Sequence, residues 1–119
     1  MRVLLDNCVN HRFGRHFLDR EVVHVRDLGW TELSNGKLLA AAEEAGFGVL
    51  LTVDKSIRKQ QNLKGKSINL LTLDTPSILI EDIILFVSDS EAAIRHLEAS
   101  DLKGQDVLVV LTRPSPAQE

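Results

Sequence analysis

Five short apolar runs, separated by segments with helical spacing, are the feature that most constrains the fold of this chain. Each run is nearly continuous rather than alternating, which is typical of parallel strands that are covered on both faces. We expect strands at Val3–Leu5, Val22–Val25, Val49–Val53, Ile68–Leu73 and Val107–Leu111. The length of 119 residues suits a single domain.

The segments between the runs predict helices on both faces of the sheet. Val9, Phe13 and Phe17 recur every four residues and would share one helix face. Ser34 is a suitable N-cap, and Gly46 is a suitable stop for the same helix. We expect helices over 9–18, 34–45, 56–62, 78–87 and 88–97. The alternation indicates a doubly wound α/β fold around a mostly parallel sheet of about five strands.

The chain shows one domain boundary and no targeting segment. We expect a domain over 1–113 and a flexible tail over 114–119, where Pro, Ser and Ala predominate. No apolar run approaches the ~18 residues of a membrane span, and the N-terminus lacks a signal-peptide pattern. These features predict a cytoplasmic protein without a membrane partner. The single cysteine, Cys8, excludes an internal disulfide framework and a Cys-rich zinc site.

Charge is unevenly distributed along the chain. The first 66 residues hold 11 lysines and arginines against 8 acids, whereas residues 67–119 hold 3 against 9. The stretch 55–66 contains five basic side chains and no acid. Such a stretch can bind phosphates even on an acidic protein, and it can equally be a solvated surface.

Aspartates follow four of the expected strands, namely Asp6, Asp27, Asp54 and Asp74. The carboxyl ends of parallel strands meet at one edge of the sheet, where ligands bind. Converging carboxylates repel one another and favour a hard cation such as Mg²⁺ or Mn²⁺. Each aspartate could alternatively cap a turn or helix. Asp6 and Asp54 are the best candidates because each follows a strand directly.

Side-chain amides form a second polar group. Asn35 opens the expected second helix, and Gln60, Gln61 and Asn62 stand together in the basic stretch. Amides contact phosphates and base edges, although here they could also belong to a helix entry and a solvated surface.

Several motifs occur in a fixed order over residues 1–112: Leu4-Leu5-Asp6-Asn7-Cys8-Val9, Gly29-Trp30, Leu33-Ser34-Asn35-Gly36-Lys37-Leu38-Leu39, Gly46-Phe47, Leu51-Thr52-Val53-Asp54-Lys55 and Gln60-Gln61-Asn62-Leu63. In this combination the chain resembles a family of bacterial PIN-like proteins. That family is regarded as predicted toxins of toxin–antitoxin pairs, related to VapC-type ribonucleases.

The resemblance implies a PIN-like three-layer α/β/α sandwich in which acids bind Mg²⁺ or Mn²⁺ and RNA is cleaved. Asp6 and Asp54 match the metal-binding acids, and Asn35 stands where many relatives carry an acid. The catalytic set is therefore expected to be Asp6, Asp54, Asp27 and Asn35. Expected RNA contacts are Lys55, Gln60, Gln61, Asn62, Arg12 and Arg15.

Three hypotheses about function follow. The first is a metal-dependent ribonuclease, the toxin of a toxin–antitoxin pair, with an antitoxin protein as partner. The second is a non-catalytic PIN-like module that binds nucleic acid or a partner protein, because only Asp6 and Asp54 match the family acids. The third is a receiver-like phosphoacceptor domain, with Asp54 as acceptor and Thr72 nearby. The apolar segment Ile78–Val87 is either core or an interface with an antitoxin or a second copy.

Overall fold

The central sheet has five strands, all parallel, in the order β2-β1-β3-β4-β5. The computed structural model describes residues 1–111, so the expected tail at 114–119 lies outside the described residues. The strands are β1 (Val3–Leu5), β2 (Val22–His24), β3 (Val49–Thr52), β4 (Asn69–Leu73) and β5 (Asp106–Val109). The parallel α/β fold expected from the apolar runs is confirmed.

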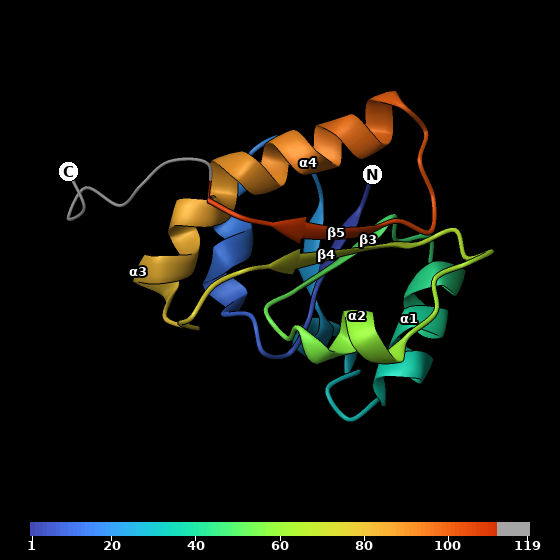
Figure 1. Ribbon diagram of the computed structural model, residues 1–119. Helices are drawn as coiled ribbons and strands as arrows, with labels where there is room; N and C mark the ends of the chain where they lie inside the picture. Colours follow the sequence, from blue (N-terminus) through green and yellow to red (C-terminus); the bar gives the residue numbers. More distant parts are fainter. Residues whose placement is uncertain (112–119) are drawn as a thin grey trace.

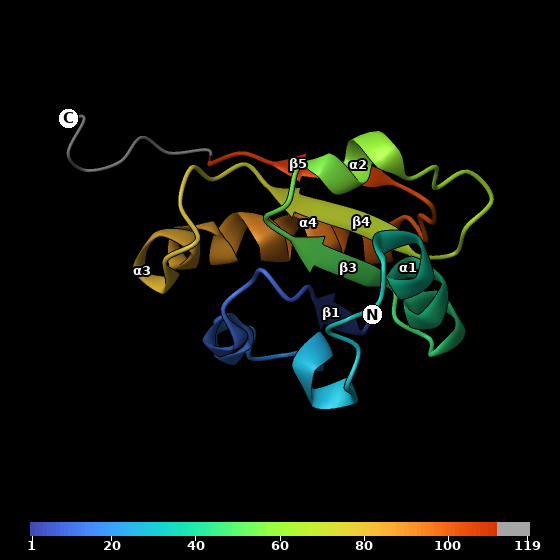
Figure 2. The same ribbon diagram turned by 90° about the horizontal axis from the view of Figure 1, so that it is seen from below.

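Helices cover both faces of the sheet and make it the middle layer of three (Figures 1 and 2). They are η1 (His11–His16), η2 (Val25–Leu28), α1 (Asn35–Glu44), α2 (Ser56–Gln60), α3 (Ile80–Ile83), η3 (Ile84–Phe86) and α4 (Val87–Ala99). In Figure 1, α4 lies on one side of the sheet and α1 and α2 lie on the other. Among the helices of residues 1–111, none is long and apolar enough to cross a lipid bilayer.

Alternate residues of each strand supply two separate cores. Val3 and Leu5 pack with η1, α3 and α4, whereas Leu4 packs with α1 and α2. The sheet has a core on each face because the side chains of successive strand residues point to opposite faces. This explains why the strands read as continuous apolar runs in the sequence.

The segment after β1 is shorter and tighter than expected. It forms the six-residue 3-10 helix η1 rather than an α-helix over 9–18. Gly14 packs so closely on β2 that an added Cβ would lie 3.1 Å from Val22 Cγ1. Val9, Phe13 and Phe17 are all buried, although only Phe13 lies within η1, so the three do not share one helix face as expected.

The apolar segment 78–87 is divided between core and surface. It contains α3 and η3, after which α4 starts at Val87 and runs without a break to Ala99. Ile83 and Phe86 are buried, whereas Ile78, Leu79 and Leu85 are 64%, 56% and 53% exposed. Three large apolar side chains therefore remain on the surface of this region.

Candidate functional site

The order of the strands places a switch point between β1 and β3. From β1 the chain moves outward to β2, then returns to the other side of β1 and continues through β3, β4 and β5. Neighbouring connections diverge at such a point, and ligands of open α/β sheets bind at the adjoining carboxyl ends. Asp6 follows β1 directly, and Asp54 stands two residues beyond the end of β3.

Asp6 is a nearly buried carboxylate, with 8% of the residue exposed. Its amide donates to the carbonyl of Leu51 at 3.0 Å, which extends the β1–β3 pairing and sets Asp6 beside Thr52. Thr52 Oγ1 donates to Asp6 Oδ2 at 2.8 Å, and the amide of Asn7 donates to Asp6 Oδ1 at 2.8 Å. These contacts fix the orientation of the carboxylate at the edge of the sheet.

Cys8 completes the immediate surroundings of Asp6. Its Sγ lies 3.4 Å from Asp6 Oδ2 and 3.3 Å from Thr52 Oγ1. Burial, together with the negative charge of Asp6, raises the pKa of the Cys8 thiol. Because the thiolate is the reactive form of cysteine, Cys8 acts here as a weak hydrogen-bond donor rather than as a nucleophile.

Asp54 is held at the start of α2. Its Oδ1 accepts hydrogen bonds from the amide and hydroxyl of Ser56, at 2.9 and 2.6 Å. Its own amide donates to Thr52 Oγ1 at 3.0 Å, so Thr52 connects Asp54 to Asp6. Within residues 1–111, Asp54 Oδ2 accepts no hydrogen bond, which leaves one oxygen of this carboxylate available to a ligand.

Asp27 and Asn35, the other expected catalytic residues, are placed differently. Asp27 is exposed on η2, and Asn35 is the first residue of α1. In the part of the chain that the structure describes, no hydrogen bond joins either residue to Asp6 or Asp54. Their expected roles therefore stay predictions.

The expected RNA contacts fall into separate regions. Lys55 forms an ion pair with Asp74 beyond the ends of β3 and β4. Arg12 and Arg15 are exposed on η1, the element that follows β1. Gln60 is exposed at the end of α2.

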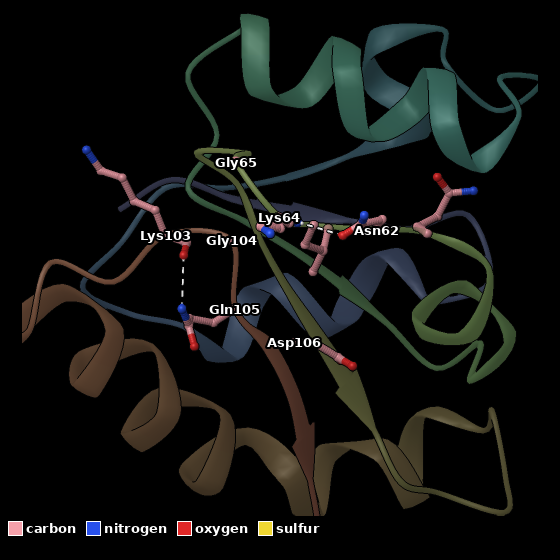
Figure 3. A pocket seen from close by; sticks show the side chains of 9 residues that line it. Asn62, Lys64, Gly65, Lys103, Gly104, Gln105 and Asp106 are labelled. Atoms are coloured by element: carbon pink, nitrogen blue, oxygen red, sulfur yellow. Dashed lines mark hydrogen bonds between the residues drawn. The ribbon is translucent and has the colours of Figure 1, made fainter.

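Gln61 and Asn62 follow α2, and the side chain of Gln61 reaches the first turn of α1, where its Oε1 would lie 3.4 Å from a Cβ on Gly36, the neighbour of Asn35. Gln61 and Asn62 line a pocket of about 470 Å³ that is closed on its other side by residues 103–106, just before and at the start of β5 (Figure 3). Arg58 donates to Asp106 at 3.1 Å beside this pocket. The three amides of the basic stretch are therefore divided: Gln61 contacts the start of α1, whereas Asn62 lines the pocket before β5.

Comparisons of the chain with family models, with curated proteins and with solved structures found no match. Among residues 1–111, no group of three or more histidine, cysteine, aspartate or glutamate side chains is arranged to hold a metal ion. The candidate site at the carboxyl ends of β1 and β3 comprises Asp6 and Asp54, which Thr52 links by hydrogen bonds. Reasoning from sequence missed Thr52, although its position two residues before Asp54, at the end of a strand, marked it as a neighbour.

Proposed function

We propose that this chain is a metal-dependent ribonuclease of the PIN type, acting at the carboxyl ends of β1 and β3. The observation that carries the proposal is the nearly buried carboxylate of Asp6 at the switch point of the sheet. Buried carboxylates are costly unless they are paired or bind a cation. The motif resemblance adds the toxin role and an antitoxin partner, for which exposed Ile78, Leu79 and Leu85 offer an apolar surface.

The two carboxylates suit a hydrated Mg²⁺ or Mn²⁺ better than a closed protein cage. Mg²⁺ usually keeps several waters and takes one or two protein carboxylates, together with phosphates of the substrate. Asp6 and Asp54 would hold such an ion, and the free Oδ2 of Asp54 fits this role. When bound, the ion would activate water and stabilise negative charge at a phosphodiester.

The residues around the pair have supporting roles. Thr52 orients Asp6 by donating to Oδ2, and Ser56 orients Asp54 by donating twice to Oδ1. Cys8 adds a third donor beside Asp6 without competing as a nucleophile. Arg12 and Arg15 carry positive charge on the element that follows β1, where an RNA backbone can approach.

The experiment is a calorimetric Mn²⁺ titration of the wild type, Asp6→Asn and Asp54→Asn, paired with cleavage assays on single-stranded RNA. Asp19→Asn serves as the matched control, because Asp19 is an exposed acid outside the site. We expect saturable binding and cleavage in the wild type and in the control, and loss of both in the site variants. A wild type that neither binds Mn²⁺ nor cleaves RNA would overturn the proposal.

A non-catalytic PIN-like module is the second candidate. It is favoured by the hydrogen bonds that Asn7, Thr52 and Cys8 already make to both oxygens of Asp6, because the chain itself satisfies this carboxylate. Full RNA affinity in EDTA, with no cleavage products when Mn²⁺ is restored, would select this candidate.

The receiver-like alternative shares the strand order seen here, which is common to flavodoxin-like folds. Thr72, which that alternative places near the acceptor Asp54, pairs with Thr52 in the register of β3 and β4. Incubation with acetyl phosphate, followed by mass spectrometry of Asp54, tests it directly. A stable phosphoryl adduct on Asp54 would replace the ribonuclease proposal.

A further inference from the structure

A hollow of about 300 Å³ opens next to Asp6, at the carboxyl ends of β1 and β2. Its walls come from the loop after β1, from the junction of β2 with η2, and from the segment before α3. It is lined by Asn7, Cys8, Val9, Asn10, His11, His24, Arg26 and Ile78. Among the described residues 1–111, no carboxylate belongs to this lining, although Asp6 precedes it and Asp27 follows Arg26 in the chain.

His24 holds two walls of the hollow together. This buried residue accepts a hydrogen bond at Nδ1 from the amide of Arg26, at 3.1 Å. Its proton must therefore reside on Nε2, which donates to the carbonyl of Val9 at 2.7 Å. His24 thereby links the loop after β1 to the start of η2, on two sides of the hollow.

Arg26 and His11 provide the polar groups at the mouth of the hollow. Arg26 Nη1 donates to His11 Nδ1 at 2.8 Å, so His11 carries its proton on Nε2 and has a donor left to offer. The Arg26 guanidinium is always charged and has further N–H groups. Desolvation, followed by the charges of Arg26 and Arg12, lowers the pKa of His11.

We propose that Arg26 and His11 bind a phosphate of single-stranded RNA and hold the strand across Asp6. Arg26 and His11 both line the hollow, and the polar hydrogens that their mutual hydrogen bond leaves over are donors, as a phosphate requires. Ile78, which is 64% exposed, forms an apolar wall against which a ribose or base can pack. The assignment rests on the proposed function, and it names the contact that positions the substrate beside the carboxylates.

The test measures binding of a fluorescent oligouridine by anisotropy in EDTA, over a series of salt concentrations. Arg26→Gln should weaken binding about tenfold, as expected for a charge-assisted hydrogen bond. It should also reduce the slope of log K against log salt by about 0.7, the value for one single-strand phosphate contact. Arg26→Lys should recover part of the affinity and the full slope, because it keeps the charge.

Arg95→Gln is the matched control, since Arg95 is an exposed arginine on α4, with a side chain that is 66% exposed. It should bind as the wild type does. An Arg26→Gln variant with wild-type affinity and slope would overturn the assignment, as would a wild type that binds no RNA.

The two proposals fail separately. If Asp6→Asn abolishes cleavage while Arg26→Gln binds RNA normally, the ribonuclease stands and the phosphate site is wrong. If Arg26→Gln weakens binding with the reduced salt slope while the wild type cleaves no RNA in Mn²⁺, the phosphate site stands without the ribonuclease.

Discussion

Thr52 Oγ1 donates a hydrogen bond of 2.8 Å to Asp6 Oδ2, across 46 positions of sequence. The same oxygen accepts the amide of Asp54 at 3.0 Å. One hydroxyl therefore links the ends of β1 and β3 and fixes how the two carboxylate-bearing loops sit relative to each other. This relationship makes Thr52 the residue whose substitution best tests the architecture of the site.

Thr52→Val should destabilise the protein by about 2 kcal/mol, because the variant leaves Asp6 Oδ2 with only the weak Cys8 thiol as donor and the amide of Asp54 without its acceptor. It should also weaken Mn²⁺ binding, whereas Thr52→Ser should retain both properties. Urea unfolding and calorimetry measure the two effects. Wild-type stability in Thr52→Val would show that the hydroxyl is not required.

Thr72 provides an internal contrast to Thr52. It pairs with Thr52 in the register of β3 and β4, and it is fully buried, yet within residues 1–111 its hydroxyl has no hydrogen-bond partner. Thr72→Val keeps the shape and removes an unsatisfied polar group, so it should leave stability unchanged or raise it by up to about 1 kcal/mol. A clear loss of stability in urea would reveal a partner for this hydroxyl.

Arg26→Gln should raise the pKa of His11 toward its ordinary value of about 6.5. Because the pKa of His11 is lower in the folded chain than in the unfolded one, the unfolded chain binds more protons at pH values between these two pKa values. The free energy of unfolding should therefore fall as the pH drops through this range in the wild type, and should fall less in the variant. NMR titration of His11 gives the pKa, and an unchanged value would show that Arg26 does not act on it.

Arg20 ties the loop before β2 to α4. It donates to both oxygens of Glu91, at 3.0 and 3.1 Å, and to both oxygens of Glu98, at 3.0 and 3.1 Å, while its own side chain is only 8% exposed. Arg20→Met keeps the aliphatic stem but removes the guanidinium that Glu91 and Glu98 share, and it leaves Glu98 paired only with the N-terminal ammonium. We therefore expect a loss of about 2 kcal/mol in urea unfolding. Arg95→Met should cost little, because its contact to Glu91 is exposed and 3.8 Å long.

The Arg20 contact also predicts the pH dependence of this loss. The hydrogen bond from Arg20 lowers the pKa of Glu98, so the stabilisation is complete above the ordinary glutamate pKa of about 4.3 and disappears as the pH falls through the lowered value. The difference between the wild type and Arg20→Met should shrink in that acidic range. A difference that stays constant there would contradict the assignment.

Substitutions of Gly104 and Gly65 test the two turns that line the pocket before β5. Gly104 has φ +66°, and a Cβ there would lie 2.7 Å from the carbonyl oxygen of Leu63, which is backbone and cannot move aside. Gly104→Ala should therefore cost about 3 kcal/mol. Gly65 has φ +81° with open space around it, so Gly65→Ala should cost only about 1 kcal/mol. Equal losses in thermal unfolding would show that the close contact is not decisive.

The local sequence pattern was sufficient to predict the strands and to place Asp6 and Asp54 at the carboxyl ends of β1 and β3. The apolar runs were readable because parallel strands bury both faces, and each run fell within about two residues of the observed strand. The helix after β1 was less predictable. Its 3-10 geometry depends on the approach of Gly14 to Val22, which is a tertiary contact.

The composition and spacing of the chain thus determined the class of fold, the two-sided core and the edge where its carboxylates gather. Only the tertiary structure decided which polar groups meet there. The register between β1 and β3 brings Thr52 to Asp6, and the hydrogen bonds of His24 to Val9 and Arg26 bring Arg26 to the mouth of the hollow. The chain after α2 brings Gln61 to the first turn of α1 and Asn62 to the pocket before β5. Strand periodicity is local, whereas these meetings depend on pairing and packing between segments distant in sequence.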